Sequence, residues 1–474
     1  MEGLEISEVL LSKVKTESYS YRWDSTYFLK EFIYSPLENI KTDYIESLFK
    51  IKSGTTPRNR DETLKEGVIL LKTNDIRNNV LKDKGDSFFY IDSDTNLKMK
   101  STQLKQNDVL INIVGATTDV IGRVSYISDS FPKANITQAM SLMRAKQTKV
   151  LPQYLFCFLL TKYNNMQVRR FARPTGQFNM NHSELGGFEI PLLSLDFQQE
   201  LIKLVSKNNI LELTSKQTYL QAENILLQEI DLQNFTPSQE AINIKSFKDS
   251  FVTSGRLDSE YYQKKYEDIE NKILTSSNGF TTITNEFYHI SKKSEKELNG
   301  YNYIEIGDVN VNDGSCKSNY ILTEELPANA KTLVSKGDIL ISKVRPYRGA
   351  VSIVNFIKKD LIVSGAFTVL REKEISVFSS EVLKVLLRTN EYKELLLKFN
   401  VGTSYPVIKD IDVLNLPIPI ISKEIQEVIT SKIQLSSKLK KQSEYLLEVA
   451  KKAVEIAIEE NETIALTYIS KNIT

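Results

Sequence analysis

Two copies of one sequence pattern follow each other along the chain, and this duplication limits the possible fold more than any other feature. Each copy begins with an Arg-x-Asp-Ser-x-Tyr motif, continues with a turn before an apolar strand and closes near a Pro. The matched segments are 22–30 with 256–264, 107–111 with 337–341, and 185–191 with 411–417. The repeat predicts two similar domains and two similar sites for a partner with two similar parts. The alternative is an old duplication in which one half only supports the other.

Length and composition predict a soluble protein of several domains. The 474 residues are too many for one core, and 41% hydrophobic with 26% charged residues is an ordinary soluble composition. The chain has no apolar run of about 18 residues, and its first residues lack the pattern of a signal peptide. The only cysteines, Cys157 and Cys316, lie in different halves and indicate a reducing compartment. We therefore expect a cytoplasmic location.

Charge is distributed unevenly, although the net charge is only +1. No Asp or Glu occurs between Ser130 and Ser183. The basic residues of this stretch are Lys133, Arg144, Lys146, Lys149, Lys162, Arg169, Arg170 and Arg173. A weaker counterpart at 339–371 has a single acid, Asp360. Such local basic fields attract polyanions. The alternative is a solvated face whose acidic partners come from elsewhere in the fold.

Each half contains the same order of predicted elements. Runs rich in β-branched residues and bounded by Gly, Asn or Asp predict short strands. A short helix, a loop with Gly and Thr, and an extended segment marked by Pro follow. In the first half these are strands 68–71, 109–114 and 122–127, helix 152–163, loop 173–177 and segment 189–193. In the second half they are strands 302–306, 339–342 and 349–354, helix 379–388, loop 401–405 and segment 415–420.

A long helical pattern closes each half, at 195–232 and 422–460, with Asp196 and Ser422 as the predicted N-caps. Apolar residues recur every seven positions, which is typical of a coiled coil. The repeated positions are Leu213, Leu220 and Leu227 in the first helix, and Ile425, Leu439, Leu446 and Ala453 with Val428, Leu435, Val449 and Ile456 in the second. An antiparallel pair of this length would span roughly 50 Å. The alternative is two amphipathic helices packed on separate cores.

These elements predict an α+β fold with two similar β-rich domains, separated and followed by long α-helices that pair as an antiparallel coiled coil. A Pro- and Ser-containing linker at 234–239 follows the first helix. The predicted divisions are a lead-in with the first domain at 1–194, the first helix at 195–232, the linker, lead-in and second domain at 233–421, and the second helix with a tail at 422–474.

No catalytic motif is found. The sequence lacks a P-loop, a G-x-G-x-x-G after a strand and a C-x-x-C pair, and its two histidines have no metal or triad spacing. It also lacks the Gly-rich cofactor loop and the Asn/Asp-Pro-Pro-aromatic turn that an adenine methyltransferase needs. Asp108 and Asp338 stand in equivalent places and are predicted to be turn residues before a strand. We expect a protein without catalytic or metal-binding residues.

The motifs together resemble those of the specificity subunit of Type I restriction-modification systems. In the first half the resemblance lies in Gly54-Thr55-Thr56-Pro57, Thr73-Asn74-Asp75-Ile76, Thr175-Gly176-Gln177-Phe178-Asn179-Met180, Ile190-Pro191-Leu192 and Gln198-Gln199-Glu200. In the second half it lies in Gly402-Thr403-Ser404-Tyr405, Leu416-Pro417-Ile418-Pro419 and Glu424-Ile425-Gln426-Glu427. The order and duplication of the motifs carry the resemblance. The second half departs from the pattern at 289–293, where it has no G-x-T-P.

The resemblance implies a non-catalytic subunit that recognises double-stranded DNA. Each β-rich half would be a target recognition domain, and the helices would set the distance between two different half-sites, so that the target is bipartite and asymmetric. Two methyltransferase subunits would dock on the helices and would bind S-adenosylmethionine, while this chain would hold no cofactor. A restriction/translocase subunit could join them.

Candidate DNA contacts follow from residue type and position, because Arg, Lys, Asn and Gln bind base edges or phosphates. In the first half they are Thr55, Asn74, Arg77, Arg169, Arg170, Arg173 and Gln177. In the second half they are Lys343, Arg345, Tyr347, Arg348, Ser404 and Tyr405. For each of them, simple surface solvation is the alternative.

Other classes of protein stay open at this point. A recognition subunit of a related system, in which nuclease and methyltransferase share another chain, would have the same composition. A coiled-coil adaptor without a nucleic-acid role is opposed by the acid-free stretch. A free-standing enzyme is opposed by the missing motifs.

Overall fold

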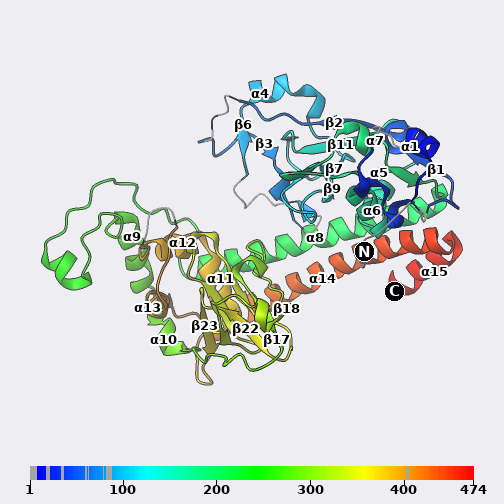
Figure 1. The fold of residues 1–474 in the computed structure, drawn as a ribbon. Coiled ribbons are helices and arrows are strands. Elements are labelled where there is room, and N and C mark those ends of the chain that lie inside the picture. Colours follow the sequence, from blue (N-terminus) through cyan, green and yellow to red (C-terminus); the bar gives the residue numbers. More distant parts are fainter. Residues whose placement is uncertain are drawn as a thin grey trace. The chain divides into compact units, whose positions relative to one another are not determined.

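A computed structural model describes most of the chain, namely residues 8–17, 22–33, 37–58, 61, 63–77, 80–81, 88–401 and 405–473. The chain forms two compact units. Unit 1 contains residues 1–213 and 439–474, and unit 2 contains residues 214–438. Each unit therefore combines one β-rich region with one half of each long helix (Figure 1). The sequence-based divisions treat the helices as separate segments, whereas the packing assigns each helix half to a β-rich region.

Unit 1 is built on a four-stranded antiparallel sheet in the order β2-β11-β7-β9. These strands are β2 (Phe49–Ser53), β11 (Met140–Ala145), β7 (Val109–Asn112) and β9 (Val124–Tyr126). A smaller sheet contains β10 (Ala134–Ile136), β3 (Val68–Leu71) and β6 (Tyr90–Ile91). Every residue of β3 and β7 is buried, which explains why both strands are continuously apolar or nearly so. The strands predicted at 68–71, 109–114 and 122–127 are confirmed.

Unit 2 repeats this sheet in the order β16-β23-β20-β21, again antiparallel. The strands are β16 (Phe287–His289), β23 (Phe367–Glu372), β20 (Ile339–Ser342) and β21 (Val351–Ile353). A second sheet contains β18 (Asn319–Leu322), β17 (Gly300–Ile304), β22 (Leu361–Ser364) and β19 (Ala330–Leu333). The matched segments 107–111 and 337–341 lead into β7 and β20, which hold the same place in the two sheet orders, so the duplication predicted from the sequence is confirmed in the fold.

Two helices follow the last long strand in each unit, where the sequence predicts one. They are α5 (Pro152–Leu159) and α6 (Lys162–Phe171) in unit 1, and α11 (Ser380–Arg388) and α12 (Asn390–Leu397) in unit 2. The Pro-marked segments form β14 (Glu189–Pro191) and β24 (Pro417–Pro419), which pair with β1 (Thr42–Tyr44) and β15 (Phe280–Thr282). The second helix was missed because α6 is rich in polar residues and α12 begins right after Thr389.

The remaining elements are short, apart from one helix in each unit. In unit 1 they are α1 (Leu11–Glu17), η1 (Ser25–Phe28), α2 (Lys30–Ile33), α3 (Ile45–Leu48), η2 (Thr73–Asp75), β4 (Ile76–Arg77), β5 (Val80–Leu81), α4 (Ser93–Lys98), η3 (Lys100–Thr102), β8 (Val114–Gly115), β12 (Arg173–Thr175), β13 (Gln177–Asn179), α7 (His182–Gly186) and α15 (Glu462–Ile473). In unit 2 they are η4 (Lys248–Val252), α9 (Lys264–Leu274), α10 (Ile283–Glu286), η5 (Ile306–Asp308), η6 (Thr323–Glu325), η7 (Pro346–Arg348) and α13 (Asp410–Leu414).

The two long helices, α8 (Leu195–Glu229) and α14 (Lys423–Glu459), lie within three residues of the predicted ranges at each end. Ser422 caps α14 as predicted, since its Oγ accepts a hydrogen bond from the Ile425 amide at 3.4 Å. The predicted cap Asp196 is wrong. The cap of α8 is Ser194, whose Oγ accepts from the Phe197 amide at 3.2 Å, because the helix begins at Leu195 and already includes Asp196 in its first turn.

The helices pair in antiparallel fashion within each unit, as predicted. In unit 1, Asn208 of α8 binds Ser443 of α14, while Phe197 near the start of α8 and Ala453 near the end of α14 belong to one buried cluster. In unit 2, Ser215 binds Ser436 and Lys432 binds Gln221. Both serine pairings are buried and polar. The seam between the helices therefore contains hydrogen-bonded layers among its apolar contacts.

The predicted heptad register is wrong for several leucines. The side chains of Leu213, Leu220 and Leu435 are exposed by 44%, 56% and 48%. The buried seam instead contains Asn208 and Ser215 on α8. Small polar residues occupy some of the positions where α8 and α14 contact each other. A search for repeated apolar residues therefore finds the leucines on the outer face of the helix and not the residues at the contact. Apolar seam positions lie nearer the β-rich regions, such as Leu201 in unit 1 and Leu226 in unit 2.

The cores of the two units include these helix halves. In unit 1, Phe197 of α8 and Ala453 of α14 belong to the same buried cluster as Phe158 and Phe188. In unit 2, Leu226 and Ile429 belong to the cluster that contains Phe378 and Leu386. Among the described residues, no helix is both long enough and apolar enough to cross a membrane.

Candidate nucleic-acid interface

A β-hairpin of unit 1 carries two of the predicted contact positions, Arg173 and Gln177. Strands β12 and β13 pair in antiparallel fashion around Gly176, whose φ of +78° favours glycine at this tight turn. The hairpin is anchored because β13 also pairs with β8. Gln177, immediately after the turn, is exposed. The loop predicted at 173–177 is therefore an ordered hairpin that carries Arg173 at its start.

Two further segments of unit 1 lead to exposed polar residues. The Thr55 amide donates a hydrogen bond to the Ile136 carbonyl at 3.2 Å, and a Cβ on Gly54 would overlap that carbonyl. The Gly of the G-T-T-P segment is thus required by close backbone packing, and it presents Thr55 to solvent. Asn74 is exposed on the one-turn helix η2. The side chain of Arg77 lies outside the described part of the chain.

Buried Asn112 connects the η2 segment with the turn that precedes β9. Its Nδ2 donates to the carbonyls of Thr73 at 3.0 Å and Val120 at 3.1 Å. The segment with Asn74 and the turn beside the hairpin are therefore held at one end of the main sheet. Sequence reasoning missed Asn112, although a polar residue at the end of an apolar strand is a visible signal.

Three side chains of unit 1, those of Ser141, Ser53 and His182, are joined by hydrogen bonds. Ser53 Oγ is 2.6 Å from His182 Nε2 and 2.8 Å from Ser141 Oγ. Partial burial and the charge of Lys52 lower the pKa of His182. His182 was predicted to have no metal or triad role, and this arrangement is a hydrogen-bonded contact between β2, β11 and the first residue of α7.

The arginines predicted to contact DNA have partners inside unit 1. Arg169 makes two hydrogen bonds to the Glu31 carboxylate, at 2.7 and 3.1 Å. Arg170 lies over the Tyr27 ring, 4.4 Å from its centroid. Arg173 pairs at 2.5 Å with Glu184, which is only 1% exposed. These side chains therefore have intramolecular electrostatic partners in the structure.

Other basic residues of the acid-free stretch are also paired with acids from outside it. Arg144 binds Asp108 at 2.6 Å, and Lys149 lies 3.3 Å from Asp43. Lys162 pairs with Glu459 of α14. The alternative stated for this stretch, acidic partners supplied from elsewhere, thus holds for a large part of it. The stretch by itself is weaker support for a polyanion site than the sequence indicated.

Asp108 and Asp338 are confirmed as turn residues and have a second role. Their carboxylates accept hydrogen bonds from the amides of Lys105 and Ser335, each at 2.8 Å. The hydrogen bond from Arg144 to Asp108 raises the pKa of the arginine, and Arg371 binds Asp338 in the same way. Both aspartates are fully buried. The same ion pair therefore stabilises the main sheet of each unit.

In unit 2 the structure brings several predicted residues together. Arg345 has left-handed backbone geometry, with φ of 48°, and its guanidinium lies 4.8 Å from the centroid of the Tyr405 ring. The Arg345 amide also donates to the Pro406 carbonyl at 2.8 Å. Tyr347 and Arg348 are exposed on η7 beside them. Ser404 lies outside the described residues.

Lys343 belongs to a neighbouring polar cluster. Its Nζ lies 2.9 Å from Asp410 Oδ1, which also accepts a hydrogen bond from Thr368 at 2.7 Å. His289 Nε2 is 3.8 Å from the same oxygen. Burial raises the pKa of Asp410, but the hydrogen bonds from Thr368 and Lys343 and nearby positive charge lower it overall. Sequence reasoning missed Asp410 and Thr368, which come close to Lys343 only in the folded chain.

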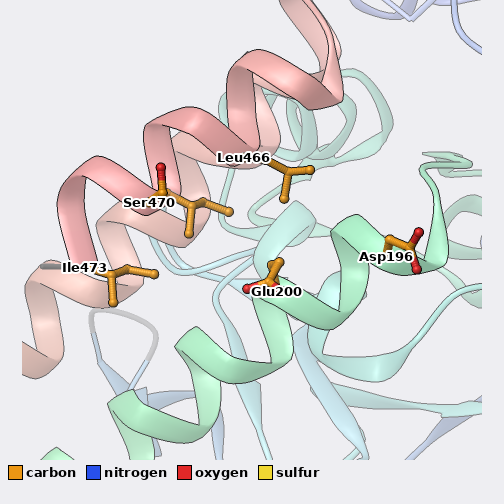
Figure 2. Close-up of a pocket in the computed structure, with 6 residues that line it drawn as sticks. Asp196, Glu200, Leu466, Ser470 and Ile473 are labelled. Atoms are coloured by element: carbon orange, nitrogen blue, oxygen red, sulfur yellow. The ribbon is translucent and has the colours of Figure 1, made fainter.

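A shallow groove of about 490 Å³ lies elsewhere on unit 1, between α8 and α15. Asp196 and Glu200 of α8 face Leu466, Ser470 and Ile473 of α15 across it (Figure 2). The sequence analysis did not predict α15 as a separate helix, so this surface was missed. Among the described residues, no group of His, Cys, Asp or Glu side chains is arranged to hold a metal ion.

Comparison with known proteins identifies the kind of domain that this duplicated architecture represents. A family model described as "Type I restriction modification DNA specificity domain" matches residues 38–224 and again residues 280–448. The chain belongs to the family of Type I restriction-modification DNA specificity domains, and it contains the domain twice. The resemblance found in the sequence motifs is thereby confirmed.

Individual relatives match shorter stretches. The chain is 22% identical over 146 residues to the Type I restriction enzyme EcoBI specificity subunit of Escherichia coli, covering 31% of this chain and 29% of that one. It is 32% identical over 130 residues to the HindI specificity subunit of Haemophilus influenzae, covering 27% and 28%. The alignments thus span less than a third of the curated relatives' length. A crystal structure of a Type I restriction-modification S subunit from M. genitalium aligns over 92% of this chain and 96% of its own, with 13% identity and a TM-score of 0.42.

Proposed function

We propose that the chain is the non-catalytic recognition subunit of a Type I restriction-modification complex, and that it reads a bipartite, asymmetric DNA target. The observation that carries this proposal is the double match to a DNA specificity domain, one match in each half of the chain. One domain would read each half-site through the loops at the end of its main sheet. Loops on a rigid sheet are a common location for binding residues.

The two candidate surfaces differ in the side chains that they present, which supports half-sites of different sequence. At equivalent positions unit 1 has His182 beside Ser141, whereas unit 2 has Asp410 beside Thr368. Unit 2 also presents Arg345 against Tyr405, while unit 1 presents a hairpin with Gln177. Different donors and acceptors select different base edges in the major groove.

Methyltransferase subunits would dock on the long helices and would bring S-adenosylmethionine with them. The outward leucines of these helices support this, because exposed Leu213 and Leu220 on α8 and Leu435 on α14 offer apolar contact area. The match to a DNA specificity domain supports the assignment of methyl transfer to the partners. The candidate residues Thr55, Asn74, Gln177, Arg345 and Tyr405 are proposed as contacts to bases or phosphates.

The test is methylome sequencing of cells with and without the gene for this chain. We expect one motif with two short, different specific parts and a gap, methylated only when the chain is present. The purified chain alone, incubated with S-adenosylmethionine and DNA, should transfer no methyl groups. An unchanged methylome in cells that retain the methyltransferase, or methyl transfer by the isolated chain, would refute the proposal.

A further inference from the structure

The duplicated Arg-x-Asp-Ser-x-Tyr motif has the same contacts in both units. In unit 1, Arg22 Nε and Nη2 donate to the two carboxylate oxygens of Asp24 at 2.6 and 2.7 Å. In unit 2, the same atoms of Arg256 donate to Asp258 at 2.8 and 2.6 Å. The motif therefore forms a two-pronged ion pair that fixes the plane of each guanidinium.

The rest of each guanidinium binds backbone carbonyls at the end of the second helix. Arg22 Nη1 donates to the Phe171 carbonyl at 2.7 Å, where α6 ends. Arg256 donates to the carbonyls of Phe399 at 3.3 Å and Asn400 at 3.0 Å, just after α12. The last carbonyls of a helix lack partners within the helix and carry partial negative charge, so Arg22 satisfies and stabilises the end of α6. In unit 2 the bound carbonyls belong to the turn that follows α12.

The tyrosine of the motif completes the arrangement. The guanidinium of Arg22 lies 5.2 Å from the centroid of the Tyr27 ring, and that of Arg256 lies 4.6 Å from the Tyr261 centroid. Arg22 is almost fully buried, at 6% exposure. The hydrogen bond from Arg22 lowers the pKa of Asp24 to about 2, so this ion pair is charged at neutral pH.

A further acid links this arrangement to the candidate interface. Glu184 lies 3.9 Å from Arg22 and pairs with Arg173, the first residue of the hairpin. In unit 2, hydrogen bonding to Asp258 raises the pKa of Arg256, and the charge of Asp412, the counterpart of Glu184, adds to this effect. The clamp of unit 1 thus contacts the two elements that flank the hairpin, while the clamp of unit 2 contacts the end of the α12 segment and is influenced by the charge on α13.

We propose that the clamps Arg22–Asp24 and Arg256–Asp258 are positioning residues for DNA recognition, and that each one orients the recognition loop of its own unit. The hairpin at 173–179 begins two residues after the carbonyl that Arg22 binds. In unit 2, Val401 follows directly after Asn400, which Arg256 binds, and Tyr405 lies against Arg345. The inference rests on the proposed function and assigns each clamp to one half of the target.

Arg→Lys substitutions test the clamps, because an ammonium keeps the charge but cannot bind a carboxylate and a carbonyl through a fixed planar fork. Arg22→Lys and Arg256→Lys would be assembled separately with the methyltransferase subunits. Methylation rates would be measured on the intact target and on two DNAs in which one half-site is scrambled. Trp23→Ala and Leu257→Ala are matched controls, since these residues lie inside the motifs but are 66% and 68% exposed.

We expect each Arg→Lys variant to lose discrimination at one half-site by about tenfold or more, the scale of one lost base contact. It should keep discrimination at the other half, and the two variants should affect opposite halves. Controls should discriminate at both halves. Full discrimination at both halves in both variants, or an equal loss at both halves in either one, would overturn the inference.

Two additions keep the outcome interpretable. If Arg22→Lys does not fold, Asp24→Asn replaces it, because asparagine keeps the size of the side chain and removes its charge. The same half-site criterion applies to this variant. Thermal unfolding would confirm that the assayed complex is folded. The wild-type complex separates the two hypotheses. If it does not distinguish intact from scrambled targets, the proposed function fails, whatever the clamp variants do.

Discussion

Glu184 shows how a single buried charge is kept in unit 1. It is 1% exposed, caps its own helix through the Asn181 amide at 2.8 Å, and pairs with Arg173. A buried carboxylate without a partner is costly. Arg173 was predicted as a DNA contact. In the structure its guanidinium compensates the negative charge of the Glu184 carboxylate.

We expect Arg173→Ala to destabilise unit 1 by about 1–2 kcal/mol, less than for a fully buried pair, because Arg173 is partly exposed and Arg22 stays near Glu184. The double variant Arg173→Ala/Glu184→Gln should recover part of this loss, since the uncompensated charge is gone. Chemical denaturation of both variants provides the measurement. Equal stability of the single variant and the wild type would mean that solvent compensates Glu184.

His182 predicts a pH effect on stability. Its pKa is lowered in the folded state from the ordinary value of 6.5, first by burial and then by Lys52. The unfolded chain therefore takes up the proton at a higher pH than the folded chain. The associated stability is complete above pH 6.5 and is lost as the pH falls through the lowered folded pKa.

The comparison is between wild type and His182→Gln in thermal unfolding from pH 8 to pH 5. The wild type should lose more stability than the variant below pH 6.5. Parallel curves would show that burial of this imidazole has no net effect on folding.

At the scale of elements, the helix seam explains why leucine spacing gave the wrong register. Asn208 donates to Ser443 Oγ at 2.7 Å, and Ser215 and Ser436 are 3.1 Å apart in the equivalent place of unit 2. Sequence spacing identifies repeats but does not tell which face of a helix is covered. When the residues at the contact between the two helices are small and polar, the repeated apolar residues lie on the outer face of the helix.

Removing one partner of such a layer should cost about 1–3 kcal/mol, because a buried hydroxyl loses its partner. We expect Asn208→Ala to show a loss of this size in urea denaturation. The pair Asn208→Ala/Ser443→Ala should lose less than the sum of the single changes. Additive losses would indicate that the two side chains do not interact.

Strong local patterns allowed the strands, the repeat and the long helices to be predicted from sequence. Strand β7 and helix α8 have continuous or periodic apolar residues, so their existence follows from local preference. Helix α6 was missed because its polar residues gave no periodic signal. The partners of Arg169 and Arg173 could not be predicted from the sequence. Glu31 approaches Arg169, and Glu184 approaches Arg173, only in the folded chain.

At the scale of the whole molecule, the outward leucines of the long helices are the positions at which partner subunits are proposed to dock. Replacing Leu220 by Glu should leave the fold of the chain nearly unchanged, because the side chain is 56% exposed. Co-purification with the methyltransferase should nevertheless fall by about tenfold or more, since a charge would be placed in an apolar contact. Gln217→Glu, an exposed polar position on the same helix, is the control. Undiminished co-purification of the Leu220 variant would place docking elsewhere.

The composition of unit 1 also has a consequence for how the protein is made. Unit 2 is one continuous stretch, 214–438, whereas the core of unit 1 includes Val449, Ala453 and Ile469 from the end of the chain. Domains fold during synthesis as their residues emerge, and contacts between distant residues form late. Unit 2 can therefore complete its core on the ribosome first. Unit 1, although synthesised earlier, must hold Phe197 and Leu201 incompletely covered until residues 449–469 have been synthesised, so we expect its core to form after that of unit 2.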